Sequence, residues 1–145
     1  MKVHILIFTI FSLTLFSCKK NNEVEAIAPD LVGKWRMIIV RDNTTGSTST
    51  KPASINGEVE IAFAFTAYTA GKINGNTPTN TLTADFTIGR NRSIQIPSVA
   101  ASKLSETSWG REFLDNITSS QDYSFEADGK LNIHTADKTL IFQRL

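Results

Sequence analysis

Hydrophobic and polar residues alternate along two stretches in the middle of the chain, residues 58–65 and 81–88. The apolar positions are Val59, Ile61, Phe63 and Phe65 in the first stretch and Leu82, Ala84, Phe86 and Ile88 in the second. Successive side chains of a β-strand point to opposite faces of the sheet. Each stretch therefore predicts a strand with one face in a hydrophobic core and the other toward water.

Shorter stretches predict further strands. Residues 34–41 are β-prone, and residues 71–75 form a short segment bracketed by glycines. A turn at residues 89–92 leads into another strand, which Pro97 closes because proline has no amide hydrogen for the ladder. Residues 42–57 are rich in Ser, Thr and Gly and predict a mobile surface loop.

One segment has helical periodicity. Its apolar side chains fall within an arc of about 140° on a helical wheel, and polar and charged residues, Glu112 and Asp115 among them, fill the rest. The apolar positions are Trp109, Phe113, Leu114 and Ile117. We expect an amphipathic helix of about three turns that packs on the sheet, because so short a helix is marginal in water alone.

The C-terminal part predicts a pair of hairpins, with turns at Asp128-Gly129 and at residues 135–138. Adjacent antiparallel strands with one buried face, together with one helix, indicate an α+β domain that is mainly antiparallel β. Seven or eight such strands form either a small β-barrel or a strongly curled meander with one amphipathic helix. The barrel is favoured because closure removes exposed edges.

The N-terminus has the pattern of a secretory signal, with Lys2 first, a mostly apolar run at residues 5–16 and the small Ser17. The apolar run is about a dozen residues, whereas a transmembrane helix needs ~20. Leu15-Phe16-Ser17-Cys18 resembles a bacterial lipobox, in which the signal is cleaved before a cysteine that is then acylated. The resulting division is a signal peptide at residues 1–17, a lipidated tether at 18–30 and a globular domain at 31–145.

Acylation of Cys18 predicts a membrane-anchored protein, since two or three acyl chains hold stably where one does not. The residue after the cysteine is Lys19, and in this the chain resembles lipoproteins that are sent to the outer membrane. The expected location is therefore the bacterial cell envelope, at the outer membrane. Without Lys2, the 15 basic residues become 14 and equal the 14 acidic ones. This balance, with no basic run longer than two, indicates no nucleic-acid partner.

Catalytic chemistry is not indicated. His134 is the one histidine after the signal, and we expect it to be a solvated residue at a strand end. The chain has no Gly-x-Ser-x-Gly elbow, no His-x-x-x-His pair and no glycine-rich phosphate loop. Glu58 and Glu60 share the polar face of one strand and suit solvent better than an acid–base pair. We therefore predict no enzyme, no catalytic residues, no cofactor and no metal site.

From Leu31 to the C-terminus the chain resembles the META domain of HslJ-like bacterial proteins. The matching segments are Leu31-Val-Gly-Lys-Trp35, Gly71-Lys-Ile-Asn-Gly-Asn-Thr-Pro-Thr-Asn80, Ser102-Lys-Leu104, Leu131-x-Ile133 and Leu140-Ile-Phe142. The resemblance implies a lipocalin-like antiparallel barrel, an envelope location and a part in stress or antibiotic tolerance. It brings no catalytic residues. Many members have Gly-Cys-Asn where this chain has Pro78-Thr79-Asn80, so the family's disulfide is not expected here.

Two functions remain open. The first is a non-enzymatic envelope lipoprotein with an interaction, structural or stress-related role and an envelope protein partner. The alternative is a lipocalin-like carrier for a small apolar ligand, since Gly33-Lys-Trp35 is also similar to the Gly-x-Trp of lipocalins. Trp35 is expected in the core. A closed apolar cavity above ~300 Å³ favours the carrier, and a barrel filled by aromatic side chains favours the first function.

The lipobox gives a direct prediction. We expect Cys18→Ser to abolish incorporation of labelled fatty acid and to leave the chain unprocessed or mislocalised, because the thiol is the acylation site. Metabolic labelling of the full-length chain measures this. Unchanged labelling would contradict the lipid anchor.

Overall fold

The computed structural model describes residues 27–145 and shows a mainly antiparallel β structure with one α-helix. Its strands are β1 (Gly33–Asp42), β2 (Thr48–Ser49), β3 (Glu60–Ala67), β4 (Ala70–Asn76), β5 (Thr81–Ile88), β6 (Ile94–Gln95), β7 (Val99–Ala101), β8 (Ser120–Phe125), β9 (Leu131–Thr135) and β10 (Lys138–Arg144). The helical elements are the short turns η1 (Pro29–Leu31) and η2 (Arg90–Arg92) and the helix α1 (Ser108–Ile117). The predicted fold class is confirmed. The signal peptide, Cys18 and most of the tether lie outside the described residues.

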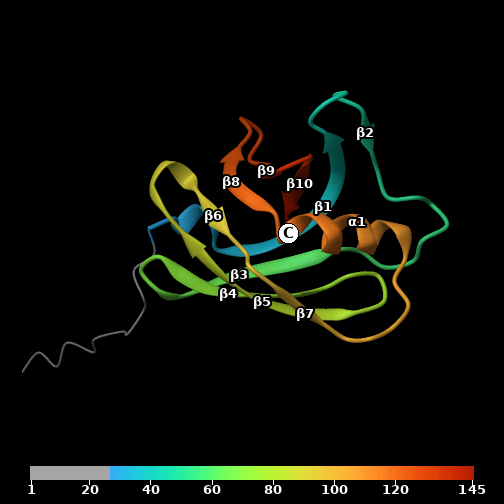
Figure 1. Cartoon of the computed structure of the whole chain (residues 1–145), viewed down its shortest axis with the longest axis horizontal. Coiled ribbons are helices and arrows are strands. Elements are labelled where there is room, and N and C mark those ends of the chain that lie inside the picture. Colours follow the sequence, from blue (N-terminus) through green and yellow to red (C-terminus); the bar gives the residue numbers. More distant parts are fainter. Residues whose placement is uncertain (1–26) are drawn as a thin grey trace, which may run out of the picture.

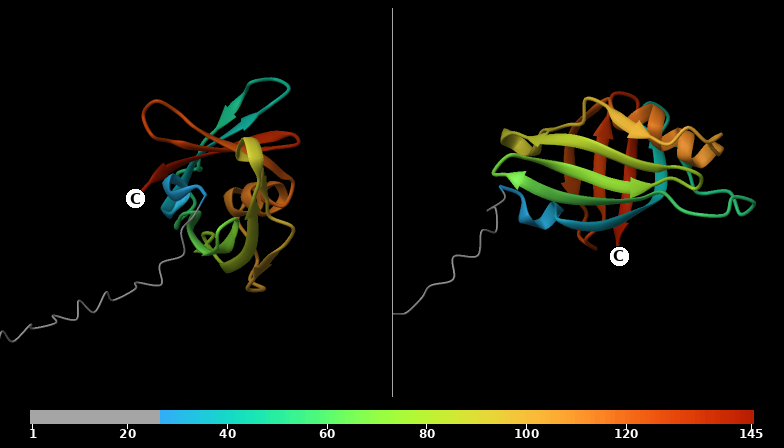
Figure 2. Two further views of the ribbon diagram at one scale, coloured as in Figure 1. Left: turned by 90° about the vertical axis from the view of Figure 1, so that its left-hand side faces the viewer. Right: turned by 90° about the horizontal axis from the view of Figure 1, so that it is seen from below.

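The strands form a single ten-stranded sheet with the order β6-β5-β4-β3-β1-β10-β9-β8; β2 pairs with β1, and β7 with β5. The sheet curls until its two ends meet at a bridge between Ser93, just before β6, and Asp122 of β8. Figure 1 and the left view of Figure 2 show β8–β10 on one side and β3–β5 on the other. The result is a nearly closed, small lipocalin-like barrel.

β1 is the strand that joins the two halves of the sheet. Its first residues, 33–36, pair with β3, whereas Val40 and Arg41 pair with β2. Between these segments the register with β10 shifts between Met37 and Ile39. Such a bulge bends a strand and increases its twist, so β1 can follow the curvature of the barrel while it stays paired with β10 on one edge.

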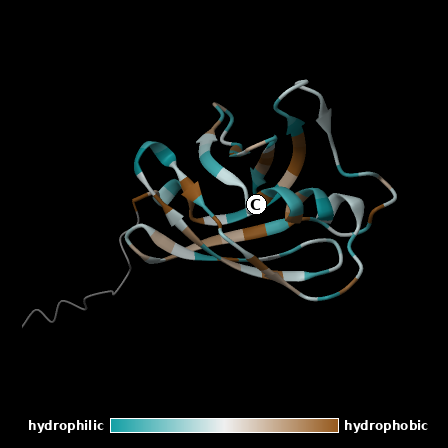
Figure 3. Cartoon of the chain, in the orientation of Figure 1, coloured by the Kyte–Doolittle hydropathy of each residue, from teal (hydrophilic) through white to brown (hydrophobic). Residues whose placement is uncertain are grey.

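The alternation that predicts the two central strands matches their burial. All four apolar side chains of β5 are buried, and so are Ile61 and Phe63 of β3 and Val59 just before it. Phe65 is only partly buried, at the margin of the core. Hydrophilic residues colour the outer side of α1 and the η2 turn in Figure 3.

Gly71 of β4 lets the aromatic residues pack. A Cβ at this position would lie 2.7 Å from the ring of Phe86 and 2.2 Å from the carbonyl oxygen of Ala64. Because Gly71 has no Cβ, the Phe86 ring can contact Phe63 and Phe65 edge-on, with ring centres 5.2 and 5.1 Å apart. Edge-to-face contact is a favoured aromatic geometry, so the glycine provides space for the core rather than only a turn.

Trp35 closes the barrel together with the last strand. Its side chain is fully buried, and its Nε1 donates a hydrogen bond to the carbonyl of Leu31 at 2.9 Å. The guanidinium of Arg144 lies over the indole at 4.3 Å. Arg144 also donates to the carbonyls of Val32, at 2.9 Å, and Asp30. The expectation that Trp35 belongs to the core is confirmed, and a cation–π contact ties it to β10.

The structure differs from the sequence prediction at the short edge strands. Within residues 42–57, predicted as a loop, Thr48 and Ser49 pair with β1 as β2. The strand β7 was not predicted, and it pairs with β5. A strand of two or three residues is too short to show an alternating pattern in the sequence. It forms because a partner strand from elsewhere in the chain lies beside it.

We expect Phe63→Ala to lower the free energy of unfolding by ~3–5 kcal/mol, the usual cost of truncating a packed aromatic residue. Glu60→Ala is the control on the opposite face of β3. Its half-exposed carboxylate pairs with Arg36 at 2.7 Å, so we expect a loss of at most ~1 kcal/mol. Denaturant melts of the two variants measure the difference, and equal losses would mean that the faces of β3 are misassigned.

Candidate functional site

The end of the barrel that carries α1 gathers most of the connecting segments. In Figure 1 this end lies opposite the point where the chain enters at Ile27. We call it the loop end and define it as residues 42–57, 77–80, 102–107 and α1. Gly57 lies against Pro78, since a Cβ added to this glycine would be 3.0 Å from the Cα of Pro78. Pro52 and Trp109 line one hollow, so the 42–57 segment also lies beside α1.

Glu106 is the polar centre of the loop end. Its carboxylate accepts hydrogen bonds from the hydroxyls of Thr77 and Thr79, the latter at 2.9 Å. It also accepts from the amide of Asn80 at 2.7 Å and from the backbone N–H of Thr107 at 2.9 Å. Thr107 in turn caps α1, since its hydroxyl accepts from the N–H of Gly110 at 3.1 Å. The β4–β5 turn is thereby fastened to the start of the helix.

Asn80 is buried and uses both ends of its amide. Its Oδ1 accepts from the Ser102 hydroxyl and from the Leu104 N–H, each at 2.9 Å, and its Nδ2 donates to the Leu104 carbonyl at 3.2 Å as well as to Glu106. A buried polar group costs free energy unless it is hydrogen-bonded. Asn80 therefore holds segment 102–106 against the sheet, and we call this group of contacts the Glu106–Asn80 network.

The network also sets the charge state of Glu106. Burial raises the pKa of its carboxyl, but the hydrogen bonds from Thr77, Asn80, Thr107 and Thr79 favour the charged form and outweigh it. The net result is a pKa below the usual value of 4.5. The carboxylate stays ionised and keeps accepting all of these bonds at neutral pH.

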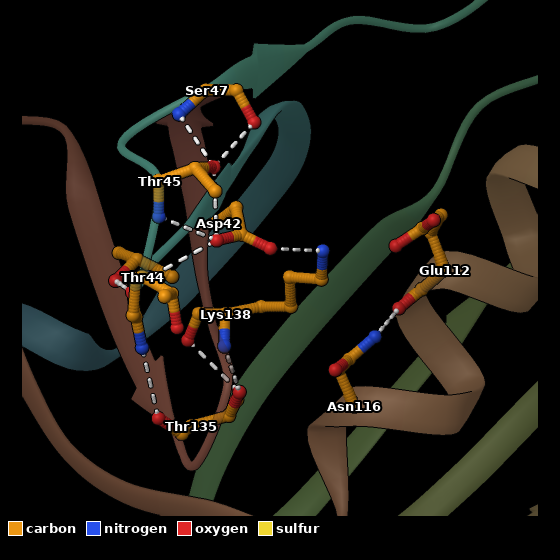
Figure 4. Close-up of polar contacts among 10 residues, drawn as sticks. Asp42, Thr44, Thr45, Ser47, Glu112, Asn116, Thr135 and Lys138 are labelled. Carbon is orange, nitrogen blue, oxygen red and sulfur yellow. Dashed lines mark hydrogen bonds and ion pairs between the residues drawn. The ribbon is translucent and has the colours of Figure 1, made fainter.

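A second contact ties two hairpins together beside the helix. Lys138, at the start of β10, donates to Asp42 at 2.9 Å, and Asp42 accepts from the N–H groups of Thr44 and Thr45 at 3.0 and 2.8 Å (Figure 4). Lys138 and these donors hold the pKa of Asp42 well below its usual range, and Asp42 raises the pKa of Lys138. Glu112 of α1 lies across from this pair in Figure 4.

A hollow of about 480 Å³ runs along the outer side of α1 and is open to solvent. Its lining residues carry both signs of charge: Glu106, Arg111, Glu112, Asp115 and Lys138, with Ser108 and Asn116. A smaller hollow of about 160 Å³ lies between α1 and the segment around Pro52. Trp109 lines it, and its buried Nε1 has no hydrogen-bond partner within the described chain.

Large side chains occupy the interior of the barrel. The largest fully buried ones are Trp35, Trp109, Phe63, Phe86, Phe113 and Phe142. Phe113 of α1 meets Phe142 of β10 edge-on at 6.4 Å, so the helix contributes its apolar face to the same core. The hollows along α1 are on the surface. Aromatic side chains from the strands and from α1 therefore share one core.

His134 is better connected than expected for a solvated strand end. On β9 its Nε2 lies 3.0 Å from the Ser124 hydroxyl and its Nδ1 lies 3.1 Å from the Thr139 hydroxyl, which donates to Asn43 at 2.8 Å. A hydroxyl beside an imidazole is the first element of nucleophilic catalysis. Neither the hollow along α1 nor the smaller one beside Pro52 is lined by His134, Ser124 or Thr139.

The carboxylates that the sequence singles out face cations or solvent in the structure. Glu58 and Glu60 bind separate cations, Lys51 at 3.1 Å and Arg36 at 2.7 Å. Glu112 and Asp115 line the hollow along α1. Sequence reasoning missed Glu106 and Asn80 as a unit, because 26 positions separate them and no pattern links them.

Among residues 27–145, no group of three or more His, Cys, Asp or Glu side chains is placed to hold a metal ion. No helix in the same range is long and apolar enough to cross a membrane. Comparisons with protein-family models, with curated proteins and with solved structures find no match to this chain.

We expect Glu106→Gln to destabilise the domain by ~1–3 kcal/mol at neutral pH, because hydrogen bonds to a charged acceptor are lost. The folded-state pKa of Glu106 is depressed, so its contribution is present above pH ~4.5 and is lost as the pH falls through the folded-state value. Melts between neutral and acid pH should show the two proteins converging at low pH. A constant difference at every pH would contradict the role of the ionised carboxylate.

Proposed function

We propose that this chain is a non-enzymatic, membrane-anchored envelope lipoprotein with a META/HslJ-like domain, whose loop end binds an envelope protein partner. The observation that carries the proposal is the filled interior. Trp35, Phe63, Phe86 and Phe142 occupy the space that a carrier would need for its ligand. Binding must then use the outer surface, and a stress-related role through a partner agrees with the META resemblance.

The loop end is the part of this surface best suited to a partner. The Glu106–Asn80 network and the Lys138–Asp42 contact hold its segments in place. Loops that are already ordered lose less conformational entropy on binding. The hollow along α1 offers both signs of charge, from Arg111 and Glu112 among others, which favours specificity for a partner of complementary pattern.

The location of the loop end supports the same proposal. The described part of the tether meets the barrel at Ile27, and the loop end lies at the opposite end of the barrel in Figures 1 and 2. A chain anchored through Cys18 therefore presents α1 away from the lipid, where a second protein has access to it.

The alternative, a carrier for a small apolar ligand, requires the core to open. Phe113 and Ile117 of α1 would have to leave the barrel, and each is fully or almost fully buried. Exposing such a side chain costs about 1.5–3 kcal/mol. The carrier is therefore supported less well than the interaction protein.

The test is photo-crosslinking of the full-length chain in native membranes. A photoreactive residue in place of Asp115, exposed on α1, should give one discrete protein adduct, and the same residue in place of Thr83, exposed on β5, should not. Arg111→Glu should lower the yield of the Asp115 adduct at least about fivefold if the charge of Arg111 in the hollow along α1 contributes ~1 kcal/mol to partner binding. Lys72→Glu on β4 makes the same charge change away from the loop end and should leave the adduct intact.

Equal adducts from both positions, or insensitivity to Arg111→Glu, would contradict a partner at the loop end. A small apolar molecule retained by the purified chain in native mass spectrometry would favour the carrier instead.

A further inference from the structure

The end of the barrel at which the tether enters has its own exposed chemistry. The N–H of Ile27 donates to the carbonyl of Tyr68 at 3.0 Å, which places the β3–β4 turn beside the entering chain. Ile27 and Tyr68 are 40% and 57% exposed. Beside Ile27, a hollow of about 280 Å³ is lined by Arg90 and Arg92. We call Ile27, Tyr68, Arg90 and Arg92 the tether-side surface.

The two arginines are presented by a tight turn. Gly89 N–H donates to the Ser93 carbonyl at 3.0 Å, and Ser93 N–H donates to the Arg90 carbonyl at 3.2 Å. Between them, Asn91 and Arg92 adopt the left-handed conformation, with φ of 56° and 59°. Residues other than glycine rarely adopt this conformation, so the backbone of the turn is closely defined.

Both arginines are exposed, and neither forms an ion pair with any residue from 27 to 145. Arg92 lies 5.8 Å from the centre of the Phe125 ring, which leaves its hydrogen-bond donors available. Asp30 is the one carboxylate among the residues that line this hollow. The surface therefore combines a small excess of positive charge with an aromatic and an aliphatic side chain.

The length of the tether limits how far this surface can lie from a bilayer. Residues 19–26, eight in all, separate Cys18 from Ile27. A chain of eight residues can span at most about 30 Å. The loop end is at the far side of the domain, so the tether-side surface is the part that meets the lipid most often.

We propose that the tether-side surface rests on anionic lipid headgroups of the bilayer that holds Cys18, and so fixes the orientation of the domain. The proposal depends on the lipid anchor of the proposed function. The planar guanidinium groups of Arg90 and Arg92 match lipid phosphates in geometry and charge. The ring of Tyr68 has the amphipathic character that places tyrosine at membrane–water interfaces. The loop end is then held toward the aqueous side.

The experiment uses the mature, lipidated chain reconstituted into vesicles of phosphatidylcholine with phosphatidylglycerol, or of phosphatidylcholine alone. Benzoylphenylalanine replaces Tyr68 or, as the matched control, Leu104, an apolar side chain 65% exposed at the loop end. We expect the Tyr68 position to crosslink to lipid at least about tenfold more than the Leu104 position in the anionic vesicles. The excess should shrink in the neutral ones.

Charge variants test the role of the arginines. Arg90→Gln with Arg92→Asn should lower the lipid yield at the Tyr68 position several-fold, since each basic residue near an anionic surface strengthens binding about fivefold. Asparagine is chosen for Arg92 because it tolerates the left-handed backbone. Lys103→Gln, at an exposed position of the loop end, removes one positive charge and should leave the lipid yield at the Tyr68 position unchanged. If the double variant fails to fold, raising the salt concentration on the unmodified chain should produce the same loss.

Vesicle flotation in the same samples distinguishes a missing lipid anchor from a wrong orientation of the domain. A chain that does not float with the vesicles lacks the anchor, and both the proposed function and this orientation fail. A chain that floats but crosslinks equally from both positions keeps the anchor and overturns the orientation. A Tyr68 yield insensitive to the arginines, to the anionic lipid and to salt overturns the headgroup contact.

Discussion

The barrel depends on the bend in β1. This strand hydrogen-bonds with β3 before its bulge, with β2 after it, and with β10 along its length. A straight strand could not serve both halves of a sheet that curls back on itself, because paired strands must stay about 4.8 Å apart throughout. Trp35, before the bulge, points into the core and carries Arg144 of the last strand on its ring. The beginning and the end of the fold are therefore joined at one contact.

Closure of the sheet decides which side chains lie in the core and which reach the surface. A small barrel places the inward side chains of all its strands in one space, and here large aromatic residues from the sheet and from α1 occupy it. The polar groups that remain must be bonded inside the fold or face water. Asn80 and Glu106 are hydrogen-bonded inside the fold and order the loop end, whereas the charged side chains of α1 face water. The charged side chains that line the hollow along α1 therefore lie on the outside of the molecule.

The two ends of the barrel differ in how their polar groups are bonded. At the end near Ile27, Arg90 and Arg92 are exposed and form no ion pair with any residue from 27 to 145. At the loop end, hydroxyl, amide and carboxyl groups are hydrogen-bonded to one another around the start of α1. The chain enters the barrel at the first end, and its longest connections gather at the second.

The sequence by itself determined the local elements. Alternation in residues 58–65 and 81–88, the apolar arc of α1 and the Asp128-Gly129 turn each depend on neighbours a few positions apart, so they are readable along the chain. It also predicts the lipid anchor, which lies outside the described residues. Only the tertiary structure decided the rest. β7 exists because β5 lies beside it, and Glu106 meets Asn80 across 26 positions. Lys138 meets Asp42 across 96 positions, and His134 gains its partners from two neighbouring strands. Periodicity records which face of a segment is buried, but the partner across the sheet is fixed by register and closure, which involve the whole chain at once.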